Sequence, residues 1–503
     1  MDTNNPIPKY LRLSSRQQSR ELDRQTIEEF GIDGFTLMEI AGAKAASFIH
    51  QKTGNSKKGL YFCGTGNNAG DALVAARYLA DRHNHSVTIL FISGSKNLSK
   101  DAEKNLSLLK KLPQTRVSIL EQANKSEGKE FDYVVDGLIG TGLSRKLESP
   151  YTEAVEEIGQ CEAPVFSLDI PTGLDADSGN IHGAAVQADY TITFGTNKTG
   201  FYLNHGPDHT GEIEFIELPF PSHLHKNDAV LITEELQNYL EPVKRVARHK
   251  YESGTVHILA GSEGLTGAAI MAAKAAWKSG AGAVFLYAPK KLLPVYEQTL
   301  PEIIKISLGN NSDEFYKPDH ATTILENLKK RPGVVVAGPG TGKSSQTIDL
   351  LAEVITKCNL PVLLDADGLS CWDKIKGSVP ANNQNILLTP HPGELKNYLG
   401  IDAADDSDRI KKLRETVKNE NVSILSKGSP TALINTRGEL FITGYDTKAF
   451  SRAGFGDLLA GTISAYWTVT NSLTDSTLHA MIDGYKTYKK QNYNHSFEPV
   501  DLL

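Results

Sequence analysis

The 503-residue sequence has few of the features that would set it apart from ordinary globular proteins. It contains only four cysteines, Cys63, Cys161, Cys358 and Cys371, and no two of them form a C-x-x-C pair. This scatter argues against a disulfide framework or a cysteine-rich metal site. It favours reduced thiols in a cytoplasmic protein.

Long apolar runs and an excess of positive charge are also missing. No run approaches the ~18 consecutive apolar residues of a membrane-spanning helix, and the start of the chain has no apolar segment typical of a signal peptide. The net charge is −7, which argues against a broad surface for nucleic acids or acidic membranes. We therefore expect a cytoplasmic protein that binds neither nucleic acid nor membranes.

Glycine is abundant, with 43 residues, and much of it follows apolar strands. The most informative stretch is LYFCGTGNNAGDALVAARYLA, residues 60–80, which predicts a strand, a loop and a helix. Gly64, Gly66 and Ala69 fit the G-x-G-x-x-G/A loop that places a dinucleotide pyrophosphate at a helix N-terminus. A nucleotide site is the first interpretation, and a plain strand–helix turn is the alternative.

Three residues distinguish this loop from an ordinary NAD loop. Asn67 and Asn68 carry amides at its tip, and Asp71 lies at the helix start, where its charge would repel a pyrophosphate. The next expected strand, residues 87–92, is followed by Ser-Gly-Ser instead of the acidic residue that binds a ribose hydroxyl in NAD enzymes. An ordinary NAD dehydrogenase is therefore disfavoured.

Two further strands of the first half end in polar loops. One ends at Asp136, and the next ends at Asp169 and is followed by Thr172. The carboxyl ends of parallel strands share one edge of an open α/β sheet, so these side chains should converge with Asn68 and Asp71. Carboxylate, amide and hydroxyl oxygens suit a hard cation. A turn or capping role is the alternative for each aspartate.

Residues 16–50 and residues 219–250 flank the strands of the first half, and we expect the former to be helical and the latter to connect two domains. Residues 16–50 should be helical, with Thr36 as the N-cap of the second helix. The composition changes around 219–250, where a Pro/His-rich segment leads into a basic run that predicts a solvated linker or, alternatively, phosphate contacts. The basic run comprises Lys244, Arg245, Arg248, His249 and Lys250. We therefore expect two domains, 1–225 and 226–503.

A second α/β unit is expected from residue 255, with a marked loop after most strands. Its strands are expected at 255–260, 284–287, 333–337, 362–365, 386–388 and 422–426, followed by a hairpin of 432–434 and 440–442. The segment GPGTGKS at 338–344 is similar to a P-loop, but that motif needs glycine at position 337, where this chain has Ala337. The GPG turn is better explained by close approach of the backbone to a ligand.

The segment AGFGDLLAG predicts a phosphoryl-transfer loop. Gly454 and Gly456 open a helix, and Asp457 lies in its first turn. Backbone amides in such a loop can hold a transferring phosphoryl group, and the aspartate can take a proton from an attacking hydroxyl. Lys427 ends a nearby strand, and residues 365–369 supply carboxylates for a cation. A simple helix-start role is the alternative for Asp457.

These stretches together resemble a family with two activities. Residues 16–220 are similar to NAD(P)HX epimerase domains in GNNAGDALVAAR, VVDGLIGTGL and SLDIPTGLDADSG. Residues 245–503 are similar to ribokinase-like NAD(P)HX dehydratase domains in AGPGTG, LLDADGL, LTPHPGE, KGSPT and AGFGDLLAG. The order matches the bifunctional bacterial repair enzymes. The resemblance implies two three-layer α/β/α domains, the first Rossmann-like and the second ribokinase-like.

The resemblance also implies a small-molecule substrate, NADH or NADPH with water added across a double bond of the nicotinamide ring. The first domain would interconvert the R and S epimers at the hydrated carbon. The second would dehydrate the S epimer at the expense of ADP, giving AMP and phosphate, or of ATP. Potassium would serve the epimerase domain, and Mg²⁺ with ADP or ATP would serve the dehydratase domain. We also expect a homo-oligomer.

Site residues are carried over from the family by position. Substrate contacts in the first domain would come from Asn67, Asn68, Ala69, Gly70, Asp71, Gly140, Thr141, Gly142, Leu143, Ser144, Arg145, Lys146 and Asp169. The potassium ligands would be Asn68, Asp136 and Thr172. Contacts to the hydrated nucleotide in the second domain would come from Ala268, Gly340, His391 and Asp457. Adenine-nucleotide contacts would come from Lys427, Gly428, Ser429, Pro430, Thr431 and Gly456. The catalytic residues would be Asp169 and Asp457.

The chain departs from the family pattern at a few positions. Glycine is usual where this chain has Ala69 and Ala72, and serine is more common at Thr172. The larger departure is Phe455, where the family usually has Ser or Thr in G-[ST]-G-D. Phe455 removes a hydroxyl and adds bulk beside the phosphate path. Two alternatives therefore stay open for the second domain, a ribokinase-like small-molecule kinase and a nucleotide-binding domain without catalysis.

Overall fold

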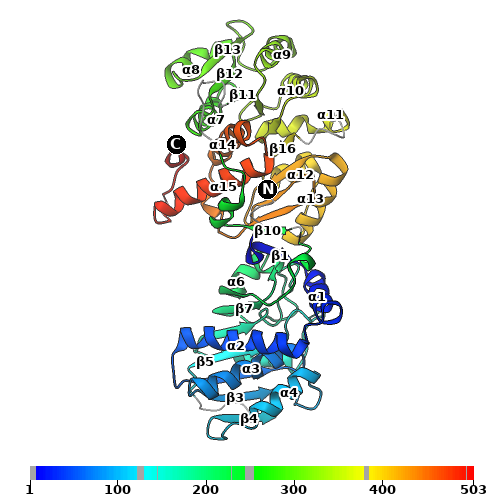
Figure 1. Ribbon diagram of the computed structural model, residues 1–503. Helices are drawn as coiled ribbons and strands as arrows, with labels where there is room; N and C mark the ends of the chain where they lie inside the picture. The colour runs from blue at the N-terminus through cyan, green and yellow to red at the C-terminus, as the bar shows by residue number, and fades with distance from the viewer. Residues whose placement is uncertain are drawn as a thin grey trace. The chain divides into compact units, whose positions relative to one another are not determined.

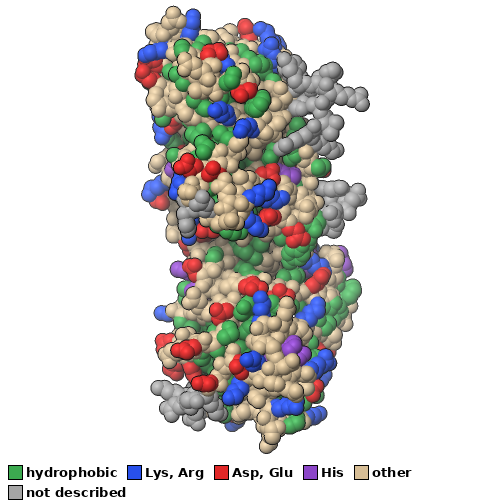
Figure 2. Space-filling model, turned by 90° about the vertical axis from the view of Figure 1, so that its left-hand side faces the viewer, with side chains coloured by type: hydrophobic (Ala, Val, Ile, Leu, Met, Phe, Trp, Pro, Cys, Tyr) green, Lys and Arg blue, Asp and Glu red, His purple; other side chains and the backbone are tan. Residues whose placement is uncertain are grey.

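The computed structural model describes residues 7–121, 130–143, 145–227, 229–243, 254–378, 385–493 and 496–503. They form two compact units, Pro8–Ala229 and Val230–Leu503, the second of which also includes Ile7 (Figure 1). Ser144 and the basic run at 244–250 lie outside the described residues. On the face of each unit drawn in Figure 2, positive and negative side chains are interspersed, in keeping with the balanced composition.

The first unit contains a seven-stranded sheet in the order β4-β3-β2-β5-β6-β7-β9, and every neighbouring pair is parallel. The strands are β2 Lys58–Cys63, β3 Ser86–Phe91, β4 Val117–Glu121, β5 Tyr133–Gly137, β6 Val165–Leu168, β7 Tyr190–Phe194 and β9 Glu212–Ile216. A short parallel pair joins β1 Arg12–Ser14 to β8 Asn197–Lys198. The strand order reverses between β2 and β5, which is where open α/β sheets bind ligands.

Helices cover both faces of this sheet because alternate strand residues point to opposite sides. Tyr61 and Cys63 pack with residues of α2 and α3, whereas Leu60 and Phe62 pack with α5. The helices are α1 Arg16–Arg24, α2 Gly34–Thr53, α3 Asn67–Arg82, α4 Lys100–Leu109, α5 Tyr151–Gly159 and α6 Gly206–Thr210, with the π-helical turn Gln25–Phe30 after α1. The first unit is thus a three-layer α/β/α domain, as predicted.

One predicted helix boundary is wrong. We expected Thr36 to be the N-cap of the second helix, but α2 starts at Gly34 and its N-cap is Asp33. The preceding π-helical turn ends at Gly31, which has a left-handed φ of +94°. Gly31 reverses the chain so sharply that the next helix starts almost at once, and a threonine already inside the helix cannot cap it.

The second unit contains a mixed sheet in the order β13-β12-β11-β14-β15-β16-β17-β18-β19-β10. The strands are β10 Ala229–Ile232, β11 Thr255–Leu259, β12 Ala283–Pro289, β13 Ile304–Leu308, β14 Val334–Ala337, β15 Val362–Leu364, β16 Ile386–Leu388, β17 Ser423–Ser426, β18 Ala432–Ile434 and β19 Leu440–Thr443. Pairs from β13 to β17 are parallel, and β17-β18-β19 are antiparallel. The predicted strands and the predicted hairpin are confirmed, with ends displaced by one or two residues.

Small residues let two helices of this unit approach closely. The helices are α7 Thr266–Lys278, α8 Leu293–Thr299, α9 Ala321–Lys330, α10 Ser345–Cys358, α11 Trp372–Ile375, α12 Pro392–Leu399, α13 Asp406–Glu420, α14 Phe455–Thr470 and α15 Leu473–Lys490. A Cβ on Gly461 of α14 would lie 2.2 Å from the carbonyl oxygen of Ala272 in α7. Only glycine therefore fits at that crossing. None of the helices among the described residues is long and apolar enough to span a membrane.

Candidate active sites

The loops after β2 and β5 touch at the carboxyl edge of the first sheet. A Cβ on Gly64 would lie 2.2 Å from the carbonyl oxygen of Leu138, so this contact needs glycine. Helix α3 begins three residues after Gly64, at Asn67. A Cβ on Gly140 would lie 3.5 Å from Cγ of Asn68 and 2.7 Å from Oδ2 of Asp169. The structure therefore brings three of the predicted loops together.

Asp136 organises the centre of this edge. It is fully buried at the end of β5. Its Oδ1 accepts hydrogen bonds from the Leu138 amide (3.2 Å) and the Thr172 hydroxyl (2.7 Å). Its Oδ2 accepts from the Ser167 hydroxyl (2.9 Å) and the Thr172 amide (2.8 Å). Burial raises the pKa of Asp136, although these hydrogen bonds oppose the shift. Asp136 thereby fixes the position of Thr172.

Asn68 has the features of a cation ligand. Its Oδ1 and Nδ2 are buried and have no hydrogen-bond partner among the described residues, although an unpaired buried polar group costs about 1–3 kcal/mol. The Thr172 hydroxyl also lies 3.2 Å from the carbonyl oxygen of Ile139, so several oxygens gather at this point. Amide, hydroxyl, carbonyl and carboxylate oxygens are the ligands of hard cations. The residues therefore fit a hard cation such as potassium.

Asp169 forms a buried ion pair directly after β6. Its φ of +64° lies in the left-handed region, which non-glycine residues rarely adopt and which often marks functional positions. The carboxylate accepts from the Thr141 amide (3.0 Å) and from Nζ of Lys198 (2.5 Å). The Lys198 side chain is 1% exposed and also donates to the Thr193 hydroxyl (2.7 Å) and the Thr196 carbonyl (3.0 Å). Three acceptors use all the hydrogens of this ammonium group.

Two more carboxylates adjoin this ion pair. Burial and the charges of Asp169 and Asp23 raise the pKa of Asp71, the fifth residue of α3, well above its usual range. Partial desolvation and the charge of Asp169 raise the pKa of Asp23, on α1, to about 7, even though this side chain still reaches solvent. The positive charge of Lys198 opposes both shifts. The site therefore holds three carboxylates around one ammonium group.

The remaining predicted substrate residues of this unit divide into buried and accessible ones. Ala69, Gly70 and Leu143 are buried, whereas Asn67, Gly142, Arg145 and Lys146 are exposed. The methyl groups of Ala69 and Ala72 are fully buried and therefore fit where the family usually has glycine. The two exposed cations lie in the loop that contacts Asp169 through Thr141. They are available for an anionic ligand.

The second unit contains a cavity of about 1150 Å³. Its lining includes most of the residues predicted for this unit, namely His391, Lys427, Gly428, Ser429, Thr431, Gly456 and Asp457. Pro430 lies in the same loop and accepts a hydrogen bond from the buried Arg409 (2.8 Å) through its carbonyl. Ala268 and Gly340 are not among the lining residues. They lie beside each other, since a Cβ on Gly340 would be 3.0 Å from Cβ of Ala268.

A second ion pair lies at the wall of this cavity. Nζ of Lys427 contacts Oδ1 of Asp365 at 2.6 Å, and the Thr389 hydroxyl donates to the same oxygen at 2.7 Å. Burial is the largest single influence on Lys427 and lowers its pKa, but the charge and hydrogen bond of Asp365, together with the charges of Glu394 and Asp457, outweigh it and raise the lysine pKa. Burial and then the charge of Asp365 raise the pKa of Asp457 to about 7. A Cβ on Gly456 would lie 3.3 Å from Nζ of Lys427, so the Gly454–Asp457 loop adjoins this pair.

The Phe455 side chain points into an aromatic cluster. It is 3% exposed and stacks on Phe497, with ring centroids 5.3 Å apart and an interplanar angle of 20°. Phe450 packs edge-on against it at 5.5 Å, and Tyr488 contacts both Phe450 and Phe497. The ring therefore takes part in packing, while Gly454, Phe455 and Gly456 line the cavity.

The segment that is similar to a P-loop, residues 338–344, contacts a carboxylate of the protein. Its Gly342 amide donates to Oδ2 of Asp367 at 3.0 Å, and Nζ of Lys343 lies 3.5 Å from the other oxygen of Asp367. The Asp367 carboxylate thus binds the amide and ammonium groups that a phosphate would need. The sequence had already disfavoured a P-loop at Ala337, and this geometry agrees.

Several functional contacts were not predicted. Asp23 of α1, Arg409 of α13 and the Lys427–Asp365 pair all depend on segments far apart in the chain. For Asp23 one signal was available, because it stands four residues after Ser19, a spacing that puts both on one helix face. No local signal marks Arg409.

Family models match most of the chain. The model described as "YjeF-related protein N-terminus" matches residues 34–200, and the one described as "NAD(P)H-hydrate dehydratase" matches residues 256–492. Together they cover parts of both units. Asp23 lies before the first matched segment.

Whole-length relatives share this arrangement. The bifunctional NAD(P)H-hydrate repair enzyme of Salinibacter ruber is 32% identical over 460 residues, which are 87% of this chain and 84% of that protein. The enzyme of the same name from Dictyoglomus turgidum is 29% identical and covers 97% of this chain and 95% of its own. Among solved structures, an ADP/ATP-dependent NAD(P)H-hydrate dehydratase from Bacillus subtilis is 22% identical, with a TM-score of 0.43, over 54% of this chain and 94% of that one.

Proposed function

Since the chain belongs to the family of bifunctional NAD(P)H-hydrate repair enzymes, we propose that it repairs hydrated NAD(P)H. Residues 1–225 would epimerise R- and S-NAD(P)HX, and residues 226–503 would dehydrate S-NAD(P)HX at the expense of ADP or ATP. The observation that carries the first activity is the Asp169–Lys198 ion pair at the sheet edge that also holds Asn68 and Asp136. It supplies a fixed carboxylate beside an expected nucleotide loop.

In the first unit, Asp169 is the proposed proton acceptor. The ammonium group of Lys198 donates to this carboxylate at 2.5 Å and holds it in place. The hydrated ring would lie between this carboxylate and the loops at 67–71 and 140–146. The exposed Arg145 and Lys146 would contact the anionic diphosphate of the substrate. All the residues predicted to contact the substrate in this unit, Ser144 among them, belong to the proposed site.

Asn68, Asp136 and Thr172 would hold potassium in this unit. The unpaired amide oxygen of Asn68 supports the assignment, because a cation would satisfy it. A bound potassium ion would supply positive charge near the loops that hold the substrate diphosphate. The residues around it act independently of this ion in proton transfer, because Asp169 takes its counter-charge from Lys198.

In the second unit, Asp457 is the proposed base for transfer of a phosphoryl group to the ring hydroxyl. Hydroxide leaves poorly, so phosphorylation makes a good leaving group, and the ring nitrogen lone pair then expels phosphate. A pKa of about 7 suits a general base at neutral pH. The amides of the Gly454–Gly456 loop would stabilise the charge on the transferring group. Residues 427–431 would bind the adenine nucleotide, and His391, Ala268 and Gly340 the hydrated one.

Mg²⁺ is proposed to accompany the nucleotide near Asp365. This carboxylate uses Oδ1 for Lys427 and Thr389, while a Cβ on Gly456 would lie 3.6 Å from its Oδ2. An oxygen directed at the phosphate loop is the donor type that Mg²⁺ prefers. The ion would neutralise charge on the nucleotide phosphates. We also propose a homo-oligomer and a cytoplasmic location, in line with a small-molecule repair role.

The test uses the full chain with a mixture of R- and S-NADHX or NADPHX and either ADP or ATP. Recovery of the reduced-nicotinamide absorbance with release of phosphate is expected. Complete consumption of the R form requires the first unit, and consumption of the S form alone requires only the second. A stable phosphorylated product would indicate a small-molecule kinase instead, and binding without turnover would indicate a catalytically silent second unit.

A further inference from the structure

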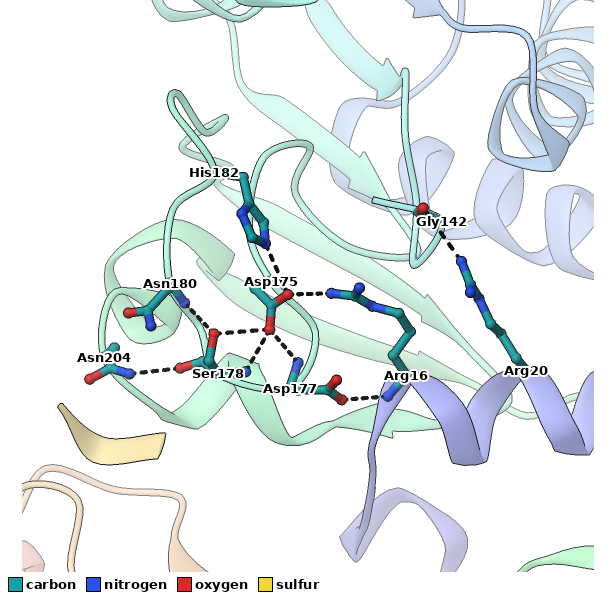
Figure 3. A network of polar contacts seen from close by, with 9 residues as sticks. All are labelled: Arg16, Arg20, Gly142, Asp175, Asp177, Ser178, Asn180, His182 and Asn204. Atoms are coloured by element: carbon teal, nitrogen blue, oxygen red, sulfur yellow. Dashed lines mark hydrogen bonds and ion pairs between the residues drawn. The ribbon is translucent and has the colours of Figure 1, made fainter. Parts of the chain in front are cut away.

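Helix α1 packs against the epimerase site through one face. That face comprises Arg16, Ser19, Arg20 and Asp23, at positions i, i+3, i+4 and i+7. The Arg16 guanidinium forms an ion pair with Asp175, and its amide donates to Asp177 at 2.5 Å. The Arg20 guanidinium donates to the carbonyl of Gly142 at 3.4 Å. Figure 3 shows both arginines reaching from α1 toward these loops.

The Asp175 network makes this attachment rigid. Asp175 also accepts hydrogen bonds from the Ser178 hydroxyl (2.9 Å) and the Asp177 amide (3.0 Å), and contacts Nε2 of His182 at 3.0 Å (Figure 3). The loop that follows Asp169 is therefore folded around the end of α1.

A chain of contacts then connects α1 to the catalytic ion pair. The Ser19 hydroxyl lies 2.9 Å from the Thr196 hydroxyl, and both are buried. The carbonyl of Thr196 accepts from Nζ of Lys198, which pairs with Asp169. Asp23 stands one helical turn after Ser19 on the same face. The helix thus carries Asp23 to the ion pair, from a segment that precedes the matched epimerase family model.

The charges that face Asp23 come from three other elements. Asp169 after β6, Lys198 in β8 and Asp71 in α3 all act on it or respond to it. On its own helix, Arg20 reaches for Gly142. Arg24 is engaged by the surface carboxylates Glu21, Glu28 and Glu29. The charge of Lys198 thus acts on Asp23 as well as on Asp169 and Asp71. The Asp23 side chain is also exposed to solvent.

We propose that Asp23 is a catalytic residue of the epimerase, which exchanges a proton with the ring nitrogen of the substrate while Asp169 exchanges one with the ring hydroxyl. This inference rests on the proposed epimerase function. It assigns opposite roles to the two carboxylates. Asp169 is oriented by its ion pair with Lys198 as the proton acceptor, whereas the pKa of Asp23, at about 7, lets it carry a proton at neutral pH.

Asp169 and Asp23 together account for both proton transfers of the epimerisation. The Asp169 carboxylate takes the hydroxyl proton, the C–O bond becomes a carbonyl, and the bond from that carbon to the ring nitrogen breaks. The electron pair goes to the nitrogen, which takes the proton of Asp23. Rotation presents the other face of the open-chain aldehyde. The nitrogen then adds to it, returns its proton to Asp23, and Asp169 returns the other proton to oxygen. The product is the opposite epimer.

Asp71 is less suited to this role. Burial and the charges of Asp169 and Asp23 raise its pKa well above the usual range, and its side chain is less exposed than that of Asp23. Asp23 remains open to water and can recover its protonation state between turnovers. Asp23 is therefore the more accessible of the two carboxylates for proton exchange with a bound substrate.

The experiment follows conversion of R-NADHX to S-NADHX by chromatography. The full chain is used without ADP or ATP, and the spontaneous rate is subtracted. We expect Asp23→Asn to lower the enzymatic rate about 100-fold or more, the usual contribution of a general acid–base group. Asp23→Glu should recover part of it. Glu21→Gln is the matched control on the same helix, and it should retain the full rate because the Glu21 carboxylate is exposed and accepts its hydrogen bonds from Arg24 at the surface.

A pH profile separates catalysis from helix attachment. The wild-type rate should fall as pH rises through about 7, because Asp23 must start protonated, and Asp23→Asn should lack this limb. Ser19→Ala, which weakens the helix contact, should lower the rate while keeping the limb. A rate for Asp23→Asn within threefold of wild type, or a limb that survives this substitution, overturns the proposal. A wild-type chain that does not exceed the spontaneous rate would instead reject the epimerase function and this inference with it.

Discussion

Replacement of Phe455 by the serine that is common in the family should destabilise the second unit without improving its activity. The ring is 3% exposed and stacks on Phe497. Removing a buried phenylalanine side chain costs about 3–5 kcal/mol, and a favourable aromatic pair contributes about 0.5–1.5 kcal/mol beyond buried area. Such a loss shifts the unfolding midpoint of a domain of this size by roughly 6 to 20 °C.

The assay combines thermal unfolding of the full chain with dehydration of S-NADHX. Phe455→Leu is the control, since it keeps an apolar side chain in the cluster and should lose less stability than Phe455→Ser. Phe497→Leu removes the stacking partner from the other side. The double variant Phe455→Leu/Phe497→Leu should be destabilised by less than the sum of the two single changes, because they share one contact.

One result would refute this reasoning. If the ring obstructs the phosphate path, Phe455→Ser will raise the dehydration rate several-fold and leave the unfolding midpoint unchanged. The structure predicts the opposite on both measurements, since the ring packs with Phe450 and Phe497 while Gly456 adjoins Lys427. The departure from G-[ST]-G-D is then a packing substitution compatible with catalysis.

Other outcomes follow from the two sites. Asp457→Ala should abolish dehydration and leave R/S epimerisation intact, and the wild-type dehydration rate should rise with pH through about 7 as this base ionises; loss of both activities would contradict the division of labour. Asp169→Ala should leave the R epimer to its spontaneous rate while S-form dehydration continues, as measured by chromatography. Asp175 has a pKa of about 2 because hydrogen bonds from His182 and Ser178 and the charge of Arg16 outweigh burial; its carboxylate should therefore stabilise the first unit by about 2–3 kcal/mol above pH 4. This stabilisation should disappear as pH falls from 4 to 2, and Asp175→Asn should show little of that pH dependence in thermal unfolding.

The strands and their polar ends could be predicted from sequence because both depend on local pattern. Apolar runs followed by Asp136 and Asp169 gave the strand ends within a residue or two, and parallel strands share one edge. The N-cap of α2 was missed by three residues because a left-handed Gly31, not the threonine, sets where the helix begins. Helix ends depend on such backbone details more than on capping residue type.

The polar pairs of the sites could not be predicted in the same way. Lys198 and Asp169 are 29 residues apart, and Ser19 and Thr196 are 177 apart. Periodicity within a helix or strand does not predict such partners, because the loops that connect the elements determine which side chains come into contact. The likeness to a known family supplied most site residues, but it could not supply Asp23, whose role depends on where α1 packs.

The three acceptors around Lys198 have a consequence for the chemistry of an electrophilic substrate. An open-chain aldehyde next to a lysine is a hazard, because a free amine would condense with it to an imine and the enzyme would inactivate itself. Nζ of Lys198 donates all its hydrogens to Asp169, Thr193 and Thr196, so as an ammonium group it has no lone pair to attack with. The same bonds that orient the base thus protect the enzyme from its own intermediate.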